Sequence, residues 1–395
     1  MAHDAVLDSF LAASHLVVPD EIPGLVDEHS RRAGARAAVV HLVDLDQLEL
    51  VPLPRSGDGA AADDAVVAVD DTPAGVSYRE VRVVEQVESG TRSVWVPMID
   101  GTERLGAIRF DFEAAAPDPD VDLLRALSAL TAELVMSKRA YGDFFEIARR
   151  RTPVTVTAEL LWQLLPPLTF ATEELVIAGF FVPADDIGGD AFDYGVDRRH
   201  AHLAIFDAMG HGMNAGLMAT TAVAAYRNSR RERMDLDAAA RRVGQIVTDQ
   251  FGETSFVTGV LATLDHRSGQ LEWRSAGHPP PLVLRRGHEP ELQAIGGQPF
   301  GVGPASAAMR AQLEPGDRLL LYTDGITEAR DADGVPLGVE RLAELVTTHA
   351  KVALAPEAVR RVMHAIEASS TPPVRDDATL VMLEWRGADA RRLTL

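Results

Sequence analysis

Residues 201–219 read AHLAIFDAMGHGMNAGLMA, and the fold can be worked out from this stretch. The apolar run Ala201–Phe206 predicts a buried strand that ends in the carboxylate of Asp207. The glycines of the GHG turn that follows let the backbone approach another group closely. Ala215–Asn228 is then predicted to be a helix. A charged side chain is thereby expected at the edge of a sheet.

Strands of the same kind recur along the chain on both sides of this stretch. They are predicted at Leu175–Val182, Phe256–Asp265, Leu282–Leu284, Arg318–Tyr322 and Ala378–Trp385. A second long helix is predicted over Leu236–Phe251, and a short amphipathic helix over Ala158–Leu165 ends at two prolines. Strands at these intervals, with helix pairs between them, indicate two packed sheets with helices outside.

Acidic residues stand at the ends of these strands. IGGD (187–190), IFDA (205–208) and LYTDG (321–325) each contain one aspartate, and Asp376–Asp377 precedes the last strand. Any one of them is typical of a turn, but several together would repel one another unless a cation lay among them. Oxygen ligands without His or Cys favour hard ions, so Mg²⁺ or Mn²⁺ fits better than Zn²⁺.

Five motifs follow one another in order at suitable spacing. They are IGGDAFDY (187–194), FDAMGHGMNAGLMA (206–219), SAGHPPPLVLRRG (275–287), PGDRLLLYTDGITEAR (315–330) and RDDATLVML (375–383). Together they resemble the PPM-type, metal-dependent serine/threonine phosphatases of the SpoIIE/RsbU branch, which are bacterial regulators of partner-switching cascades. The resemblance covers roughly Ala158–Trp385 and includes the segment QLLPP (163–167).

The resemblance implies a site and a reaction. The carboxylates that would bind metal and carry catalysis are Asp190, Asp207, Asp324 and Asp376, with the backbone carbonyl of Ala208 as a further ligand. Asp377 stands where many phosphatases of this fold have Asn, which leaves its role as a direct ligand open. Two ions about 3.5–4 Å apart would activate a water that attacks the phosphate directly. The implied substrate is a phosphorylated regulatory protein, an anti-anti-sigma factor of the STAS type.

The general acid is open at this stage. His211 in the GHG turn and His278 in the AGHPP turn could each protonate the leaving oxygen, or each could bind a loop carbonyl. Phe192 and Phe300 depart from the family pattern by apolar exchanges, which should affect packing. A small-phosphoester hydrolase and a catalytically silent sensor-scaffold stand as alternatives to a protein phosphatase.

The N-terminal part has the signature of an antiparallel sheet. Short apolar or alternating runs occur at Ala37–Leu42, Val81–Val87, Val94–Ile99 and Leu105–Phe112, with turn-rich breaks between them. Residues 94–112 (VWVPMIDGTERLGAIRFDF) resemble a GAF sensor domain. The domain would extend over 1–120, and the absence of cysteine excludes a thioether-linked chromophore in it.

Residues 121–151 are predicted to be a helical linker. Its apolar positions follow heptad steps that only Ser137 interrupts: Leu123, Leu127, Leu130, Leu134, Tyr141, Phe144 and Ala148. An amphipathic helix on its own domain and a two-stranded coiled coil in a homodimer both fit, and the position between two domains favours the coiled coil. The overall prediction is α+β: a GAF-like domain (1–120), the linker (121–151) and a phosphatase domain (152–395), a two-sheet sandwich flanked by helices.

Composition sets the outer bounds. A chain of 395 residues favours two or three domains. The net charge of −21 argues against nucleic acid or an anionic membrane as a main partner, because both are polyanions. The sequence shows no basic-then-apolar signal peptide and no uninterrupted apolar run of membrane-spanning length, so a cytoplasmic protein is expected.

Overall fold

The computed structural model describes residues 2–55, 65–182, 188–293, 295–350, 354–370 and 376–387. Ile187 and Arg375, the first residues of two of the five motifs, lie outside the described residues. The chain divides between Pro153 and Val154 into two compact units. Among the helices of these ranges, none combines the length and the apolar character needed to cross a membrane.

The first unit is built on one antiparallel sheet in the order β3-β2-β1-β6-β5-β4. Its strands are β1 (Ala37–Val43), β2 (Glu49–Pro52), β3 (Val67–Ala68), β4 (Val84–Glu88), β5 (Thr91–Asp100) and β6 (Glu103–Glu113). Three of the four predicted strands are confirmed within a few residues. The fourth begins only at Val84, because Val81 has a left-handed φ of 51° and ends a helix.

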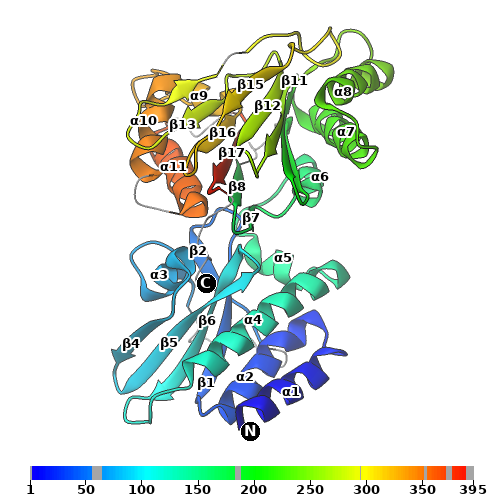
Figure 1. Ribbon diagram of the computed structural model, residues 1–395. Coiled ribbons are helices and arrows are strands. Elements are labelled where there is room, and N and C mark those ends of the chain that lie inside the picture. The colour runs from blue at the N-terminus through cyan, green and yellow to red at the C-terminus, as the bar shows by residue number, and fades with distance from the viewer. Residues whose placement is uncertain are drawn as a thin grey trace. The chain divides into compact units, whose positions relative to one another are not determined.

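Helices cover both faces of this sheet (Figure 1). They are α1 (Ala2–Ser14), η1 (Pro19–Glu21), α2 (Ile22–Arg32), α3 (Pro73–Glu80), α4 (Val121–Lys138), η2 (Arg139–Tyr141) and α5 (Phe144–Arg149). Val40 and Leu42 of β1 pack into the core shared with α1, α2 and α4, while Val43 packs with Tyr78 of α3 on the other face. This arrangement is compatible with the GAF assignment, which stays a prediction.

The heptad positions of α4 lie against the sheet of their own unit. Leu123, Leu127 and Leu134 are buried in that core, and Leu130 is half-buried against it. The helix ends at Lys138, and η2 and an extended Gly142 separate it from α5. The predicted coiled coil is therefore wrong over α4, because the four leucines of its seam are already covered within one unit, although Tyr141 beyond the helix is 79% exposed. The alternative, an amphipathic helix lying on its own domain, is confirmed for α4. A homodimer stays a prediction without this interface.

The second unit contains two sheets, as predicted, and both are antiparallel. One has the order β15-β12-β11-β10-β9 and the other the order β14-β13-β16-β17-β8-β7. The strands are β7 (Thr169–Ala171), β8 (Leu175–Val182), β9 (Asp190–Val196), β10 (His200–Ala208), β11 (Val257–Asp265), β12 (Gln270–Ala276), β13 (Leu282–Leu284), β14 (Glu291–Leu292), β15 (Met309–Gln312), β16 (Arg318–Tyr322) and β17 (Ala378–Trp385).

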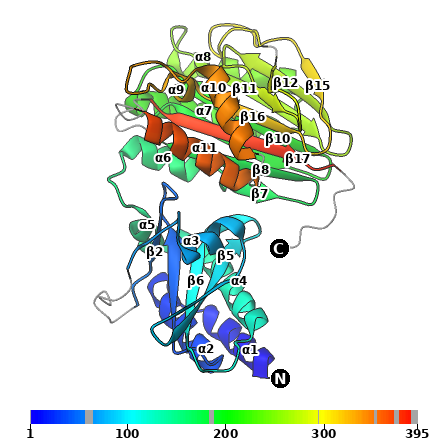
Figure 2. The same cartoon turned by 90° about the vertical axis from the view of Figure 1, so that its left-hand side faces the viewer.

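The two sheets pack face to face with a helical layer outside each (Figure 2). The helices are α6 (Val156–Leu164), α7 (Gly212–Arg231), α8 (Leu236–Phe251), α9 (Asp324–Glu328), α10 (Gly338–Ala350) and α11 (Ala355–Ser369). Strand β17 illustrates this layered packing. Its Val381 and Leu383 enter the core between the sheets, while Leu380 and Met382 pack under α10 and α11. A strand buried on both faces has a continuous apolar sequence, and the run Ala378–Trp385 is of this kind.

Candidate active site

Two of the expected carboxylates lie side by side at one end of the β9–β10 pair. Asp190 is the first residue of β9, and its register partner is Asp207, the last residue but one of β10. The prediction that Asp190 ends a strand is therefore wrong. Because the two strands are antiparallel, the start of one lies beside the end of the other, and both carboxylates still reach the same edge.

The other sheet brings its carboxylates to that edge through β16 and β17, which pair from Arg318↔Glu384 to Tyr322↔Leu380. Asp324 begins α9 two residues after β16 ends, and Asp376 and Asp377 directly precede β17. Gly325 makes this approach possible: a Cβ atom added there would lie 2.1 Å from the carbonyl oxygen of Asp377. A side chain at this position would force the two segments apart.

Hydrogen bonds connect the two sheets at this edge. Asp377 Oδ2 accepts the backbone N–H groups of Gly189 at 2.6 Å and Asp190 at 3.2 Å. The hydroxyl of Thr323 donates to Asp190 Oδ2 at 2.6 Å and accepts the N–H of Thr379 at 3.0 Å. The buried Asp377 thus holds the backbone that carries Asp190, and Thr323 orients the Asp190 carboxylate.

The electrostatics of the cluster follow from burial and from like charges. Burial, and then the charges of Asp207 and Asp377, raise the pKa of Asp190 well above its usual value. Burial, and then Asp324 and Asp376, raise the pKa of Asp207 to about 7. Burial also raises the pKa of Asp324, with a further contribution from Asp376. A divalent cation among these oxygens would relieve the repulsion, so the donor set fits the hard ions expected from the sequence.

The carbonyl oxygen of Ala208 belongs to the same edge. A Cβ atom added at Gly189 would lie 2.6 Å from this oxygen, and the N–H of Ala208 donates to the carbonyl of Gly189 at 3.0 Å. Only a glycine at position 189 allows the two backbones to run so close. The structure thereby brings together all six expected ligand residues: Asp190, Asp207, Ala208, Asp324, Asp376 and Asp377.

Two site residues were missed in the sequence. Thr323 is one, and Glu328 is the other, because its charge contributes to raising the pKa of both Asp207 and Asp324. Glu328 lies four residues after Asp324 in α9, a spacing that places both side chains on one helix face. The TDGITE segment contains this signal, but recognising it requires knowing that a helix begins at Asp324.

The two candidate histidines have different surroundings. His278 is 2% exposed, its Nδ1 lies 2.8 Å from Thr258 Oγ1, and burial lowers its pKa to about 3. It is therefore neutral near pH 7 and enclosed, which does not suit a proton donor. His211 is exposed at the N-cap position of α7, with no capping hydrogen bond from its side chain. Of the two, only His211 keeps the exposure that a general acid needs.

Helix α6 contacts the loop that precedes Asp190. A Cβ atom added at Gly188 or at Gly216 of α7 would lie within 2.5 Å of the Thr157 methyl group. At the other end of α6, Arg227 donates to the carbonyl of Leu164 at 2.7 Å and binds the buried Asp193 of β9. The helix is thus fastened at both ends to elements that carry the site.

The departures from the family pattern are packing changes, as predicted. Phe192 is fully buried over Gly179, and Phe300 is buried with its ring centroid 6.1 Å from that of Phe206.

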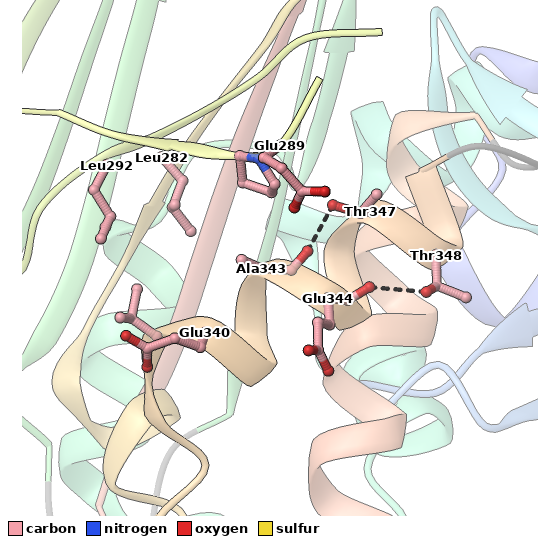
Figure 3. A pocket seen from close by; sticks show the side chains of 10 residues that line it. Leu282, Glu289, Leu292, Glu340, Ala343, Glu344, Thr347 and Thr348 are labelled. Atoms are coloured by element: carbon pink, nitrogen blue, oxygen red, sulfur yellow. Dashed lines mark hydrogen bonds between the residues drawn. The ribbon is translucent and has the colours of Figure 1, made fainter. Parts of the chain in front are cut away.

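A separate cavity of about 380 Å³ lies between the β13–β14 hairpin and α10 (Figure 3). Leu282 and Leu292 line one side, and Glu289, Glu340 and Glu344 contribute carboxylates. None of its lining residues belongs to the aspartate cluster. The candidate chemistry therefore lies at the sheet edge and not in this cavity.

Comparison with known proteins agrees with this geometry. Residues 197–386 match the family model described as Stage II sporulation protein E (SpoIIE). These residues form a SpoIIE-type phosphatase domain. The matched range contains every expected ligand except Asp190, which lies seven residues before it. The matched domain is similar to that of RsbU, whose name describes it as a phosphoserine phosphatase.

Individual relatives match over part of the chain. Phosphoserine phosphatase RsbU of Bacillus subtilis (strain 168) is 24% identical over 239 residues, which are 59% of this chain and 70% of RsbU. Protein IcfG of Synechocystis is 30% identical over 115 residues, 28% of this chain and 18% of IcfG. The solved SiaA-PP2C domain of Pseudomonas aeruginosa is similar with a TM-score of 0.50 and 24% identity, covering 58% of this chain and 93% of that structure. This last likeness supports the fold of the SpoIIE-type domain.

Proposed function

We propose that the second unit removes phosphate from phosphoserine or phosphothreonine on a regulatory protein, with divalent metal ions held by the aspartate cluster. One observation carries the proposal. Two sheets bring five aspartates to one edge, where burial and like charges raise the pKa of Asp190, Asp207 and Asp324. Such an arrangement is unfavourable without a cation and is typical of a functional site.

Asp190, Asp207, Asp324 and Asp376, with the carbonyl of Ala208, would hold two Mn²⁺ or Mg²⁺ ions. When bound, ions of this kind lower the pKa of a water and neutralise charge on a phosphoryl group. Without His or Cys in the donor set, the cluster favours these ions over softer ones.

The surrounding residues orient this set. Thr323 fixes one oxygen of Asp190, and Asp377 fixes the backbone of Gly189 and Asp190. The Asp190 carboxylate therefore does not have to be ordered when substrate binds. Asp376 is exposed, so the edge is open to a phosphoryl group on another protein's surface. His211, exposed in the turn after β10, is the better placed of the two histidines to donate a proton to the leaving oxygen.

We infer that three exposed apolar side chains that follow Asp207 in the chain form an apolar patch, which favours a protein substrate over a small phosphoester. Met209, Met213 and Leu217 are 38%, 44% and 43% exposed, and all three follow Asp207 in the turn and first helical turns of α7. Met213 and Leu217 are four residues apart and share a helix face. Exposed apolar side chains gathered beside a site are typical of protein–protein contacts. The resemblance of the five motifs to the SpoIIE/RsbU branch is what suggests an anti-anti-sigma factor of the STAS type as the substrate.

The test compares substrates on the full chain. Phosphorylated STAS-type proteins from the same genome, p-nitrophenyl phosphate and a panel of phosphorylated metabolites would each be assayed with Mn²⁺, with Mg²⁺ and after EDTA treatment. We expect turnover only with metal and none in Asp324→Asn. Full turnover by the metal-free protein would refute metal dependence, and no turnover of any substrate would favour the scaffold alternative.

The patch gives a second, sharper comparison. Leu217→Gln should lower kcat/KM for the phosphoprotein while leaving p-nitrophenyl phosphate hydrolysis unchanged, because only the protein substrate would reach the patch. The exposed Leu354→Gln, in a different part of the unit, is the matched control. If Leu217→Gln turned over both substrates as fast as the wild type does, and a metabolite were turned over faster than the phosphoprotein, a small-phosphoester hydrolase would be favoured.

Regulation by the first unit is the remaining part of the proposal, and α6 is the element that supports it. Thr157 contacts the loop before Asp190, and Arg227 ties the other end of α6 to β9. A shift of α6 would therefore displace the ligand-bearing strand. Residues 152–395 would be compared with the full chain, and equal kcat, KM and metal affinity would reject regulation through this helix.

A further inference from the structure

Two histidines and an aspartate that the phosphatase chemistry does not use lie together at the turn between β9 and β10. His200 and His202 are two residues apart on β10, so their side chains share one face of the strand. Asp197 lies in the turn just before them. One ligand atom from each of the three residues lies within 4.8 Å of the other two.

The carboxylate oxygens of Asp197 lie near a ring nitrogen of each histidine. Asp197 Oδ1 accepts the backbone N–H groups of Arg199 and His200, both at 2.8 Å, which fixes the carboxylate in the turn. Its Oδ2 lies 3.9 Å from His202 Nε2, and Oδ1 lies 3.8 Å from His200 Nδ1. The other ring nitrogen of His202 is 3.0 Å from Thr263 Oγ1 on β11. A partner on the far nitrogen is the arrangement that orients a metal-binding imidazole.

We propose that Asp197, His200 and His202 form a second metal site, which binds a late-transition-metal ion such as Zn²⁺. Two imidazoles and one carboxylate are a ligand set that suits zinc, and they differ from the all-oxygen set at the aspartate cluster. Ligand atoms around a tetrahedral zinc lie roughly 3.4 Å apart, given bond lengths of about 2.1 Å. Small rotations of the three side chains would bring their ligand atoms from the present separations, all within 4.8 Å, to this distance. Because the side chain of Asp197 is 59% exposed, water can complete the coordination.

The protonation and charge of the surroundings support the site. Burial, and then the charge of Arg230, lower the pKa of His202 to about 4, so this imidazole is neutral and able to bind metal near pH 7. Arg230 is the cation that would oppose an ion here, and it is ion-paired with the buried Asp193. Arg199, in the turn itself, is ion-paired with Asp265 at 2.8 Å.

The site is distinct from the aspartate cluster but lies on the same strands. His202 and Asp207 are both in β10, five residues or roughly 17 Å apart along the strand. An ion at the turn would fasten β9 to β10 at the end opposite Asp190 and Asp207. It would therefore stabilise the pair of strands that carries two catalytic ligands, without touching them.

The experiment measures Zn²⁺ binding to the full chain by calorimetry, in excess Mg²⁺ so that the aspartate cluster is occupied. The Asp197→Asn variant keeps the acceptor for the turn N–H groups and removes the charge. His200→Ala removes one imidazole at the surface, and Thr263→Val removes the partner of the other while keeping its shape. His288→Ala, an exposed histidine outside the site, is the matched control.

The wild-type protein and the control should bind one Zn²⁺ under these conditions, with a rise in the thermal midpoint of the second unit. Asp197→Asn and His200→Ala should abolish this event, and Thr263→Val should weaken it by roughly 10- to 100-fold. The proposal is overturned if the wild type shows no such event, or if Asp197→Asn and His200→Ala bind Zn²⁺ as tightly as the control. Unchanged thermal midpoints of the variants in Mg²⁺ alone establish that they are folded.

Discussion

Replacing one aspartate of the proposed metal site should make the metal-free protein more stable while it abolishes activity. Asp207 is half-buried among four other aspartates, and burial followed by the charges of Asp324 and Asp376 raises its pKa to about 7. Asp207→Asn keeps the shape of the side chain and removes its charge. Asn also removes a proposed metal ligand, so we expect no turnover with Mn²⁺.

The size and the pH dependence of the effect follow from linkage. A carboxyl group whose pKa is higher in the folded state than in the unfolded chain destabilises the fold wherever it must ionise. The difference between a folded-state pKa of about 7 and the usual pKa of 3.8 corresponds to roughly 4 kcal/mol in the free energy of unfolding, at about 1.4 kcal/mol per pH unit. The gain from Asp207→Asn should therefore reach up to about 4 kcal/mol at about pH 8. It should shrink as the pH falls through the window from about 7 to 3.8, because Asp207 is then protonated in the folded state and increasingly in the unfolded chain.

The assay is urea unfolding in EDTA at several pH values, followed by tryptophan fluorescence. Three of the four tryptophans, Trp162, Trp273 and Trp385, lie in the second unit and report its transition. Asp249→Asn, an exposed position on α8, is the control for removing a carboxylate elsewhere. The electrostatic reasoning would be refuted if metal-free Asp207→Asn had a lower free energy of unfolding than the wild type at high pH. It would also be refuted if the variant's gain in this free energy were the same at every pH.

Three further expectations follow from packing and assembly. Gly325→Ala should lower kcat roughly 100-fold without unfolding the protein, because its Cβ would lie 2.1 Å from the Asp377 carbonyl oxygen and displace the ligand loops; unchanged kcat would show that the loops have room. Leu134→Gln should destabilise the first unit by about 2–4 kcal/mol, read from Trp95 fluorescence, because Leu134 is 8% exposed within that unit's core. Dissociation of a dimer by Leu134→Gln without this loss would restore the coiled-coil interpretation. Light scattering at micromolar concentration should give the mass of a homodimer, and a one-chain mass would contradict that prediction.

The apolar runs of the second unit could be recognised without a structure. Leu175–Val182, Leu282–Leu284, Arg318–Tyr322 and Ala378–Trp385 were predicted with the bounds that the structure has. These strands are buried on both faces or nearly so, and their continuous apolar character is a local property of the chain. Asp207, Asp324, Asp376 and Asp377 each stand in or next to such a strand, so their place at a sheet edge could be predicted, whereas Asp190 begins a strand without this signal.

The helix over 121–138 shows where local pattern is insufficient. An apolar repeat of 3.5 to 3.6 residues is the same whether a helix packs on a partner chain or on its own sheet. Only the presence of β5 and β6 beneath α4 distinguishes the two, and that depends on contacts between residues distant in sequence. Local pattern is also insufficient for β9, because its short sequence of mixed polarity follows a glycine turn and contains no continuous apolar run.

The sequence by itself determined which residue types occur, which runs are buried, and that several carboxylates flank them. The tertiary structure decided how those carboxylates are used. Asp377 became the acceptor for the N–H groups of Gly189 and Asp190, and Thr323 the donor to Asp190, across separations of 188, 187 and 133 residues. Burial is likewise a property of the assembled sheets, and it separates the enclosed, neutral His278 from the exposed His211. Hydrogen bonds and desolvation depend on which groups meet in space, and a linear pattern contains that information only where neighbours in sequence are also neighbours in the fold.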